Sequence, residues 1–223
     1  VFESVDLSVE RGEFLVICGA VGSGKSTLLA ALARARAPIG GEVAAVERRA
    51  FVSQKAFVMN GSVRSNVLFE RPFDRERYAR ALTLAVLNTD LALLPAGDAT
   101  VVGEAGVQLS GGQRARLALA RALYADADAV FLDDVLAAVD AHTGRALWDG
   151  AVVELLARGS AVVLVTHALQ LLSHERVSRV AVVRGGAVVA CDTWRQLRAR
   201  EGDGLEDELM AHATAAEAPA SRA

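Results

Sequence analysis

The sequence predicts an α/β domain with a mainly parallel sheet and one helical insertion. Three uninterrupted apolar runs are typical of strands that are buried on both faces, and these runs are Phe14–Cys18, Ala129–Leu132 and Ala161–Val165. Segments rich in good helix formers separate them, which is the order that places strands side by side in a parallel sheet. Between residues 61 and 124 the pattern becomes mainly helical, which predicts the insertion.

The other elements follow from local patterns. We expect helices at 26–36, 63–69, 75–87, 114–124, 142–157 and 194–200. We expect short strands at 41–46, 50–52, 177–183 and 187–190, of which the last two form a hairpin. Asp74 is expected to cap the helix at 75–87, and the Gly-, Pro- and Asp-rich segment 94–106 to be loop.

Composition excludes several classes of protein. The chain has 223 residues, of which 52% are hydrophobic and 23% charged, so wholesale disorder is excluded. The formal net charge is -3, which provides no overall basic field, and we expect no nucleic-acid partner. The two cysteines, Cys18 and Cys191, exclude a disulfide scaffold and favour a reducing compartment.

Membrane and secretion signals are not expected within these residues. No run of about 20 mostly apolar residues is present. Glu3, Asp6 and Glu10 interrupt the first residues, so we expect no signal peptide. The chain begins with Val1 rather than Met, and we expect it to be part of a longer polypeptide.

A glycine-rich loop after the first apolar run predicts a phosphate-binding site. The sequence from Gly19 to Ser26 fits G-x-x-x-x-G-K-[ST] and lies between an expected strand and an expected helix. Glycines allow backbone N–H groups to turn toward phosphate oxygens, and the helix N-terminus adds partial positive charge. Lys25 is expected to reach the β- and γ-phosphates, and Ser26 to bind Mg²⁺. The alternative is an ordinary glycine turn with a surface lysine.

Polar residues follow three other expected strands. Asp133 ends an apolar strand and is the candidate Mg²⁺ ligand, unless it and Asp134 merely cap the next helix. Asp134 occupies the place of a water-activating base. Gln54 follows a short strand and is expected to order water or Mg²⁺ through its amide. His167 is expected to touch the γ-phosphate, although a histidine after an apolar strand is more often packed or capping.

The segment Leu109-Ser-Gly-Gly-Gln113 resembles the signature motif of ATP-binding-cassette (ABC) proteins. Five further elements resemble the family and follow its order. They are a Walker A loop at 19–27, a Q-loop at Gln54, a Walker B strand at 130–133, a D-loop at 137–140 and a switch His167. The resemblance implies a RecA-like P-loop NTPase core at residues 1–200, with a helical subdomain at about 61–124 and a tail or linker at 201–223.

The resemblance assigns residues to ATP and Mg²⁺. It implies catalytic roles for Gln54, Asp134 and His167, and metal ligands at Ser26, Gln54 and Asp133. The nucleotide-binding residues that it implies in Walker A are Gly19, Val21, Gly22, Ser23, Gly24, Lys25, Ser26 and Thr27. In the signature motif they are Ser110, Gly111, Gly112 and Gln113.

The signature motif also has a direct physical interpretation. The Ser110 hydroxyl, adjacent glycine N–H groups and the N-terminus of the following helix form a second anion site. In the family this site closes over the γ-phosphate held by the Walker A loop of a partner cassette, so that two cassettes enclose two ATP molecules. The alternative is a helix N-cap followed by flexible glycines.

Three features resemble the first cassette of the C subfamily, the multidrug-resistance-associated proteins. Residues 51–69 resemble the exporter segment that receives coupling helices of the membrane domain. Gln54 follows Lys25 by only 29 residues, a compact spacing. Asp134 stands where most cassettes have Glu, and because Asp is one methylene shorter we expect slow hydrolysis at this site.

The function implied is that of a weakly hydrolysing ATP-binding cassette of a membrane exporter. Its partners are a second cassette and transmembrane domains on the same polypeptide. Its place is the cytoplasmic face of a membrane, and the substrates are organic anions, drugs or conjugates. The alternatives are a nucleotide-sensing cassette of a channel regulator and a soluble ABC ATPase.

The sequence departs from the family pattern at three places. Val135 replaces the usual Pro, and Ala138 replaces a Ser, which removes a D-loop hydroxyl. The aromatic residue that stacks on adenine lies in the family upstream of Val1, and we expect it there. Phe2 lies too near the Walker A loop to serve.

Overall fold

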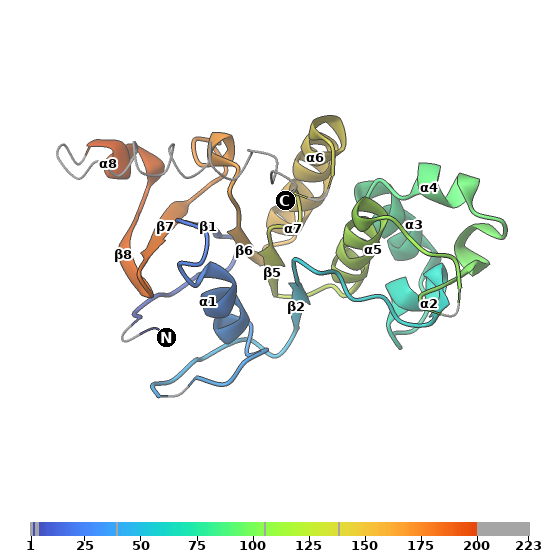
Figure 1. The fold of residues 1–223 in the computed structure, drawn as a ribbon, viewed down its shortest axis with the longest axis horizontal. Coiled ribbons are helices and arrows are strands. Elements are labelled where there is room, and N and C mark those ends of the chain that lie inside the picture. The colour runs from blue at the N-terminus through green and yellow to red at the C-terminus, as the bar shows by residue number, and fades with distance from the viewer. Residues whose placement is uncertain (1, 3–4, 39, 105, 138, 200–223) are drawn as a thin grey trace, which may run out of the picture.

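A computed structural model describes residues 2, 5–38, 40–104, 106–137 and 139–199. Its main sheet has six strands in the order β2-β5-β6-β1-β7-β8 (Figure 1). The strands are β1 (Phe14–Cys18), β2 (Arg49–Val52), β5 (Ala129–Asp133), β6 (Ala161–Val165), β7 (Arg179–Arg184) and β8 (Ala187–Asp192). All neighbouring pairs are parallel except β7 and β8. The predicted α/β class is therefore confirmed.

The three apolar runs form the centre of the sheet. Every residue of β1, β5 and β6 is buried, as the absence of polar alternation in these runs predicts. β7 and β8 form the predicted hairpin. Gly185 and Gly186 have φ of 56° and 79°, which is the two-glycine turn that matches the twist of paired strands.

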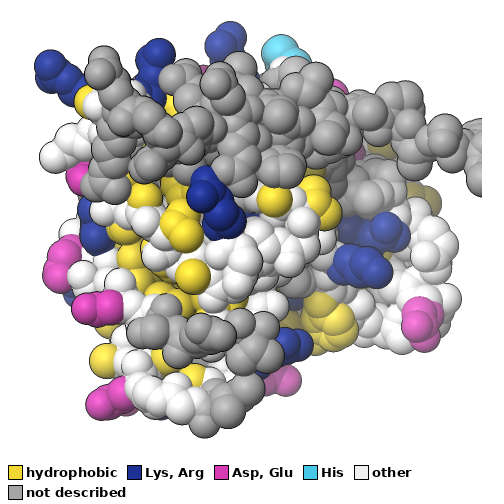
Figure 2. Space-filling view, turned by 60° about the vertical axis from the view of Figure 1, so that its left-hand side comes forward, with side chains coloured by type: hydrophobic (Ala, Val, Ile, Leu, Met, Phe, Trp, Pro, Cys, Tyr) yellow, Lys and Arg dark blue, Asp and Glu magenta, His cyan; other side chains and the backbone are white. Residues whose placement is uncertain are grey.

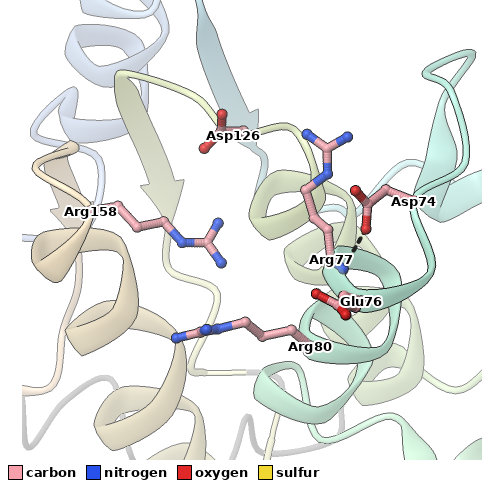
Figure 3. Close-up of a pocket in the computed structure, with 6 residues that line it drawn as sticks. All are labelled: Asp74, Glu76, Arg77, Arg80, Asp126 and Arg158. Atoms are coloured by element: carbon pink, nitrogen blue, oxygen red, sulfur yellow. Dashed lines mark hydrogen bonds between the residues drawn. The ribbon is translucent and has the colours of Figure 1, made fainter.

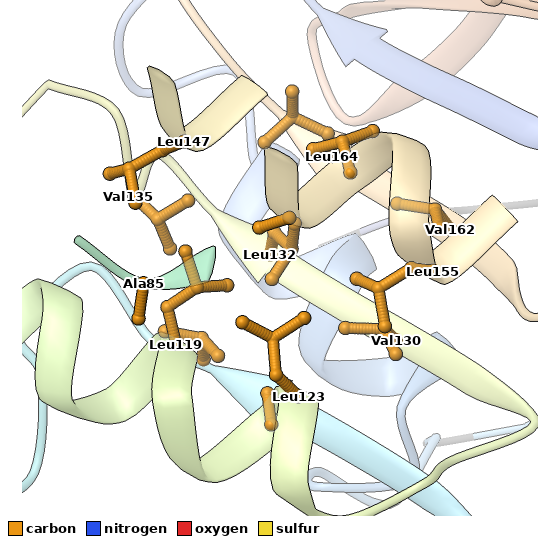
Figure 4. Close-up of a cluster of buried hydrophobic side chains, with 14 of the residues drawn as sticks. Ala85, Leu119, Leu123, Val130, Leu132, Val135, Leu147, Leu155, Val162 and Leu164 are labelled. Atoms are coloured by element: carbon orange, nitrogen blue, oxygen red, sulfur yellow. The ribbon is translucent and has the colours of Figure 1, made fainter. Parts of the chain in front are cut away.

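Helices cover both faces of the sheet. α1 (Lys25–Leu32) lies on one face, where Leu28 and Leu29 pack with alternate residues of β1 such as Ile17. α5 (Gly111–Tyr124), α6 (Ala141–Leu147), η2 (Trp148–Val152) and α7 (Val153–Ala157) lie on the other. Figure 4 shows Leu119 and Leu123 of α5 facing β5, with side chains of β6 and α7 beside them.

The helical subdomain projects from the β2 and β5 side of the sheet (Figure 1). It contains α2 (Val63–Leu68), α3 (Arg75–Leu84), α4 (Asn88–Leu93), η1 (Gly97–Ala99) and α5. β3 (Gly61–Ser62) pairs with β4 (Val101–Val102), and α2 begins directly after β3. The Asp74 side chain accepts a hydrogen bond from the backbone N–H of Arg77, which confirms the predicted cap of α3.

Several predicted boundaries were wrong. Residues 41–46 form no strand: the segment is largely exposed and pairs with no strand of either sheet. The predicted loop 94–106 contains η1 and β4, whose pairing with β3 depends on a distant segment. Helices predicted to end at 36 and 87 end at Leu32 and Leu84, each followed within two residues by a residue with positive φ, at Arg34 and Val86.

The helix predicted at 142–157 extends from Ala141 to Ala157 but includes a π-turn at Trp148–Val152. Gly150 lies in this turn against Leu84 of α3, where an added Cβ would be 3.4 Å from the leucine Cδ2 atom. α8 (Trp194–Ala199) matches its prediction up to Arg200, which lies outside the described residues. The predicted tail at 201–223 also lies outside them.

Surface charge and helix length add two observations. On the face drawn in Figure 2, basic and acidic side chains are interspersed rather than gathered by sign. Across the ranges that the structure describes, no helix is both long and apolar enough to cross a membrane.

Candidate functional site

The carboxyl ends of four parallel strands carry the predicted site residues. In the sheet register Ile17 of β1 lies opposite Val165 of β6, and Val165 lies opposite Asp133 of β5. Open α/β sheets bind ligands at this edge. The groups that directly follow the strand ends are the glycine-rich loop, Gln54, Asp134 and His167.

The glycine-rich loop uses backbone conformations that disfavour any other residue. Gly19, Gly22 and Gly24 have φ of 144°, 80° and 102°. A Cβ on Gly19 would lie 2.2 Å from the carbonyl oxygen of Val183 in β7, so no side chain fits there. α1 begins at Lys25, and its unpaired first N–H groups adjoin the loop. The loop is therefore shaped to bring backbone donors to a phosphate.

Lys25 places its ammonium group inside the loop. Its Nζ donates hydrogen bonds to the carbonyl oxygens of Gly19 and Ala20, at 2.8 and 2.7 Å. Burial lowers the pKa of Lys25, while the nearby negative charges of Asp134 and Asp133 act in the opposite direction. Anionic phosphate oxygens are stronger acceptors than these neutral carbonyls, so a bound phosphate would take over the ammonium donors.

Ser26 and Asp133 form a pair of oxygen ligands. The Ser26 Oγ donates a hydrogen bond to Oδ1 of Asp133 at 2.9 Å, which joins α1 to β5. Burial raises the pKa of Asp133, the Ser26 hydroxyl counteracts this, and the charge of Asp134 raises it further. A cation bound beside Asp133 and Asp134 would neutralise their charges and reduce the repulsion between the two carboxylates. Hydroxyl, carboxylate and phosphate oxygens are the ligands that Mg²⁺ prefers.

Asp134 is held beside Asp133 in an unusual conformation. Its φ is 49°, and its backbone N–H donates to the carbonyl oxygen of Val165 at 2.9 Å, so the turn after β5 is tied to the end of β6. Its Oδ2 accepts a hydrogen bond from Nε2 of Gln54 at 3.4 Å. Gln54 and Asp134 thus face one another where water activation was predicted.

The alternative that Asp133 and Asp134 cap the next helix was wrong. The cap of α6 is Asp140, whose side chain accepts a hydrogen bond from the backbone N–H of Thr143 at 2.9 Å. Asp140 belongs to the predicted D-loop. Ala138, the D-loop departure from the family, lies outside the described residues.

His167 is half-buried after β6 and belongs to the same electrostatic cluster. Burial lowers its pKa and the charge of Lys25 lowers it further, while Asp134 and Asp133 oppose that shift. A histidine with a lowered pKa is neutral at pH 7, so it can donate one hydrogen bond without adding charge.

Ser23 provides an independent test of whether a nucleotide fits. Its Oγ is shielded from solvent and has no hydrogen-bond partner among the described residues. A buried hydroxyl without a partner costs about 1–3 kcal/mol, and a phosphate oxygen in the loop would remove that cost. In the part of the chain that the structure describes, no cluster of three or more His, Cys, Asp or Glu could hold a metal alone. The residues present therefore fit Mg²⁺ bound together with phosphate.

The signature segment forms the exposed N-terminus of α5. The Ser110 Oγ accepts a hydrogen bond from the backbone N–H of Gln113 at 3.2 Å, and the Gln113 Oε1 accepts one from the backbone N–H of Ser110 at 2.9 Å. This capping box confirms the helix cap considered as the alternative. It is compatible with anion binding, because the Ser110 hydroxyl hydrogen and the N–H groups of Gly111 and Gly112 are not used by the box.

The structure does not bring the signature segment to the phosphate loop. α1 and α5 pack on opposite faces of the sheet, and Figure 1 shows them on different sides of β2 and β5. The predicted site residues therefore form two separate groups. The group at the phosphate loop contains Lys25, Ser26, Gln54, Asp133, Asp134 and His167, and the group at the start of α5 contains Ser110 to Gln113.

A separate cavity of about 650 Å³ lies between α3 and α7 (Figure 3). Arg80 of α3 donates to Glu154 of α7 at 2.5 Å, which ties the helical subdomain to the core. Arg158 at the end of α7 also donates to Glu154, at 2.7 Å, within the same helix. The walls balance three arginines against three carboxylates, and none of them was a predicted site residue. The lining residues are Asp74, Glu76, Arg77, Arg80, Asp126 and Arg158.

Two contacts near the predicted groups were not foreseen. The Phe2 ring lies against the phosphate loop, where a Cβ on Gly24 would be 2.9 Å from its Cε2 atom. Asp90 of α4 accepts hydrogen bonds from the side chains of Gln113 and Arg116. No sequence signal marks Asp90, because it lies 23 residues before Gln113 and becomes its neighbour only through helix packing.

A phosphate loop, a hydroxyl–carboxylate pair and a helical insertion with an exposed helix N-terminus define a nucleotide-binding domain of the P-loop class. Comparison with known proteins identifies the family. The profile described as ABC transporter matches residues 2–137, which is more than half of the chain. The chain belongs to the ABC transporter family, as the resemblance of its motifs predicted.

Individual relatives are C-subfamily and multidrug-resistance proteins. The chain is 43% identical over 208 residues to "ABC-type transporter cicA" of Emericella nidulans, covering 93% of this chain and 14% of that protein. It is 41% identical over 194 residues to human "ATP-binding cassette sub-family C member 4", covering 87% and 14%. It is 40% identical over 201 residues to "Multidrug resistance protein mrp-7" of Caenorhabditis elegans, covering 90% and 13%. The chain thus spans about one seventh of the length of these relatives.

Proposed function

We propose that this chain is an ATP-binding cassette of a membrane exporter, in the position of the first cassette of a C-subfamily protein, and that it works paired with a second cassette. One observation carries the proposal. The exposed N-terminus of α5 at Ser110 lies apart from a phosphate loop whose own ligands, Lys25, Ser26 and Asp133, lie together. Each group is half of a site, and a second cassette supplies the complementary halves.

The roles of the residues at the Lys25 half follow from their contacts. Lys25 exchanges its carbonyl partners Gly19 and Ala20 for the β- and γ-phosphates of ATP. Ser26 and Asp133 hold Mg²⁺, which when bound supplies charge neutralisation to the phosphates. Gln54 joins them as an amide ligand of Mg²⁺ or as the group that orients water.

Asp134, whose carboxylate faces Gln54, determines the rate of ATP hydrolysis at the Lys25 half. Asp134 orients the attacking water, and the neutral His167 donates a hydrogen bond to the γ-phosphate. Because the Asp side chain is one methylene shorter than Glu, its carboxylate is retracted from the water position and hydrolysis here is slow. ATP binding does not depend on that carboxylate.

An aromatic surface on the helical subdomain supports a membrane-domain partner. Phe57, Phe69 and Phe73 are 61%, 39% and 54% exposed. The Arg121 guanidinium lies over the rings of Phe57 and Phe69, at 5.8 and 4.7 Å from their centroids. Exposed aromatic side chains that are held in place by a guanidinium group are typical of a docking surface for another protein segment. We assign that segment to transmembrane domains of the same polypeptide, which place the cassette at the cytoplasmic face of a membrane.

The transported compounds are assigned only by class. Organic anions, drugs or conjugates are the substrates implied by likeness to the C subfamily. This assignment rests on the likeness alone and on no described residue of this chain. A nucleotide-sensing cassette of a channel regulator is the second candidate, which the slow-site residue Asp134 also favours. ATP-driven flux of a labelled organic anion supports the exporter, whereas ATP-gated current without such flux supports the regulator.

The ATP assignment is tested by binding measurements on matched lysine variants. Lys25→Ala removes the ammonium from the phosphate loop and is expected to weaken ATP binding at least tenfold in calorimetric titration, since a charge-assisted contact to phosphate is lost. Lys55→Ala removes an exposed lysine just after Gln54 and leaves the affinity unchanged. Equal affinities of the two variants would refute the site.

A further inference from the structure

Asp90 joins α4 to the beginning of α5 through four hydrogen bonds. Its Oδ1 accepts from Nε2 of Gln113 at 3.1 Å and from Nη2 of Arg116 at 2.9 Å. Its Oδ2 accepts from Nε and Nη2 of Arg116 at 3.0 and 2.8 Å. The side chains of Arg116 and Asp90 are 14% and 13% exposed, so water screens this bidentate pair weakly.

The Gln113 side chain connects Asp90 to the signature segment. Its amide nitrogen is held by Asp90, and its amide oxygen accepts the backbone N–H of Ser110. One planar group therefore connects the fixed carboxylate to the N-cap of α5. Asp90 also fixes which end of the Gln113 amide is the donor, because a carboxylate only accepts hydrogen bonds.

No residue of α4 is fully buried, and Leu91 packs only partly buried against the core. Without the carboxylate, the Gln113 amide would be free to rotate, and the Ser110 backbone would lose a fixed acceptor. The Ser110 hydroxyl and the first glycine N–H groups of α5 would then sample more positions.

We propose that Asp90 is a positioning residue for ATP hydrolysis at the partner's phosphate loop. Through Gln113 it fixes the Ser110 hydroxyl and the N-terminal N–H groups of α5 in the geometry that meets the γ-phosphate. The inference rests on the proposed pairing of cassettes. Asp90 acts through Gln113, so it changes the rate constant through orientation rather than the affinity of the Lys25 loop.

The test measures ATP turnover by two assembled cassettes in the full-length polypeptide. Asp134→Asn in this chain silences the Lys25 half, so that the remaining turnover reports the partner's site. In this background Asp90→Ala is expected to lower kcat about tenfold with little change in KM, less than the ~10²-fold loss for removal of a direct donor. Asp90→Asn keeps an oxygen acceptor for Gln113 and is expected to restore most of the rate.

Asp98→Ala is the matched control. Asp98 forms the same kind of pair with Arg64, at 2.8 Å, within the same subdomain, but it does not contact α5 through Gln113. It is expected to lower stability without changing kcat. In a double-mutant cycle, Asp90→Ala added to Gln113→Ala is expected to cause no further loss, because both changes act through one contact.

Ser110→Ala separates the two ways in which the idea can fail. If Ser110→Ala does not lower turnover at the partner's site, the proposed pairing fails. If Ser110→Ala lowers turnover while Asp90→Ala matches Asp98→Ala, the role of Asp90 is refuted and the pairing stands. Amide hydrogen exchange in the first turn of α5, compared between Asp90→Ala and wild type, tests the same role without turnover: faster exchange in Asp90→Ala supports it, and equal exchange refutes it.

Discussion

Lengthening the carboxylate at position 134 is expected to accelerate hydrolysis at the Lys25 site. The Oδ2 of Asp134 lies 3.4 Å from Nε2 of Gln54, a long contact, and its backbone is fixed by the bond from its N–H to Val165. Because the backbone cannot advance, the side chain alone sets how far the carboxylate reaches. One added methylene moves it by about 1 Å, and a displacement of that size is worth on the order of 10²-fold in rate.

Asp134→Glu is therefore expected to raise kcat by about 10²-fold, which corresponds to about 2.7 kcal/mol of activation free energy. The assay is single-turnover hydrolysis of labelled ATP by the assembled pair, with the partner's own catalytic carboxylate neutralised. ATP affinity is expected to remain within twofold, since Lys25 and the loop are untouched.

Asp126→Glu is the control, because it makes the same chemical change at an acid that pairs with Arg48 on the surface and lies outside the site. Its turnover is expected to equal that of the wild type. Unchanged turnover in Asp134→Glu would refute the argument that side-chain length limits this site. A gain shared equally by both variants would show that the effect has another cause.

Three further predictions concern the scaffold. Gly19→Ala places a Cβ 2.2 Å from the carbonyl oxygen of Val183 at a φ of 144°, and calorimetry is expected to show loss of ATP binding together with a lower melting temperature. Leu123→Ala, at a residue 1% exposed, is expected to cost about 2–5 kcal/mol in urea unfolding, whereas Val189→Ala, at 47% exposure, costs under about 0.5 kcal/mol. Burial alone would raise the pKa of Glu13, but hydrogen bonds from Arg179 and the Glu10 backbone hold it below its usual value. This contribution is present above the unfolded pKa of about 4.3 and is lost as the pH falls through the lower folded pKa, so Glu13→Gln is expected to flatten the loss of unfolding free energy below about pH 5.

The core of the fold was predictable because its signals are local. β1, β5 and β6 are apolar throughout since both faces of each strand are covered, and burial on both faces leaves no polar alternation in the sequence. The glycine-rich loop was predictable for a similar reason, since its positive φ angles require glycine at fixed places.

Features that depend on contacts between distant segments were not predictable. The π-turn at Trp148–Val152 forms where Gly150 meets Leu84 of another helix, and β4 forms because β3 lies beside it. Asp90 carries no motif, and its link to Gln113 exists only once α4 has packed beside α5. The sequence places Asp134 after a strand, but the φ of 49° is set by its bond to the neighbouring strand.

The dependence of ATP turnover on protein concentration tests the central claim most directly. The claim is that each ATP is enclosed by the phosphate loop of one cassette and the signature segment of the other, to which this chain contributes Lys25 at one site and Ser110 at the other. The account predicts that the specific activity of equimolar cassettes, over a dilution series below their dissociation constant, falls in proportion to concentration, so that the total rate rises as its square. A total rate strictly proportional to concentration down to the highest dilution would contradict the account, because a single cassette would then contain a complete site.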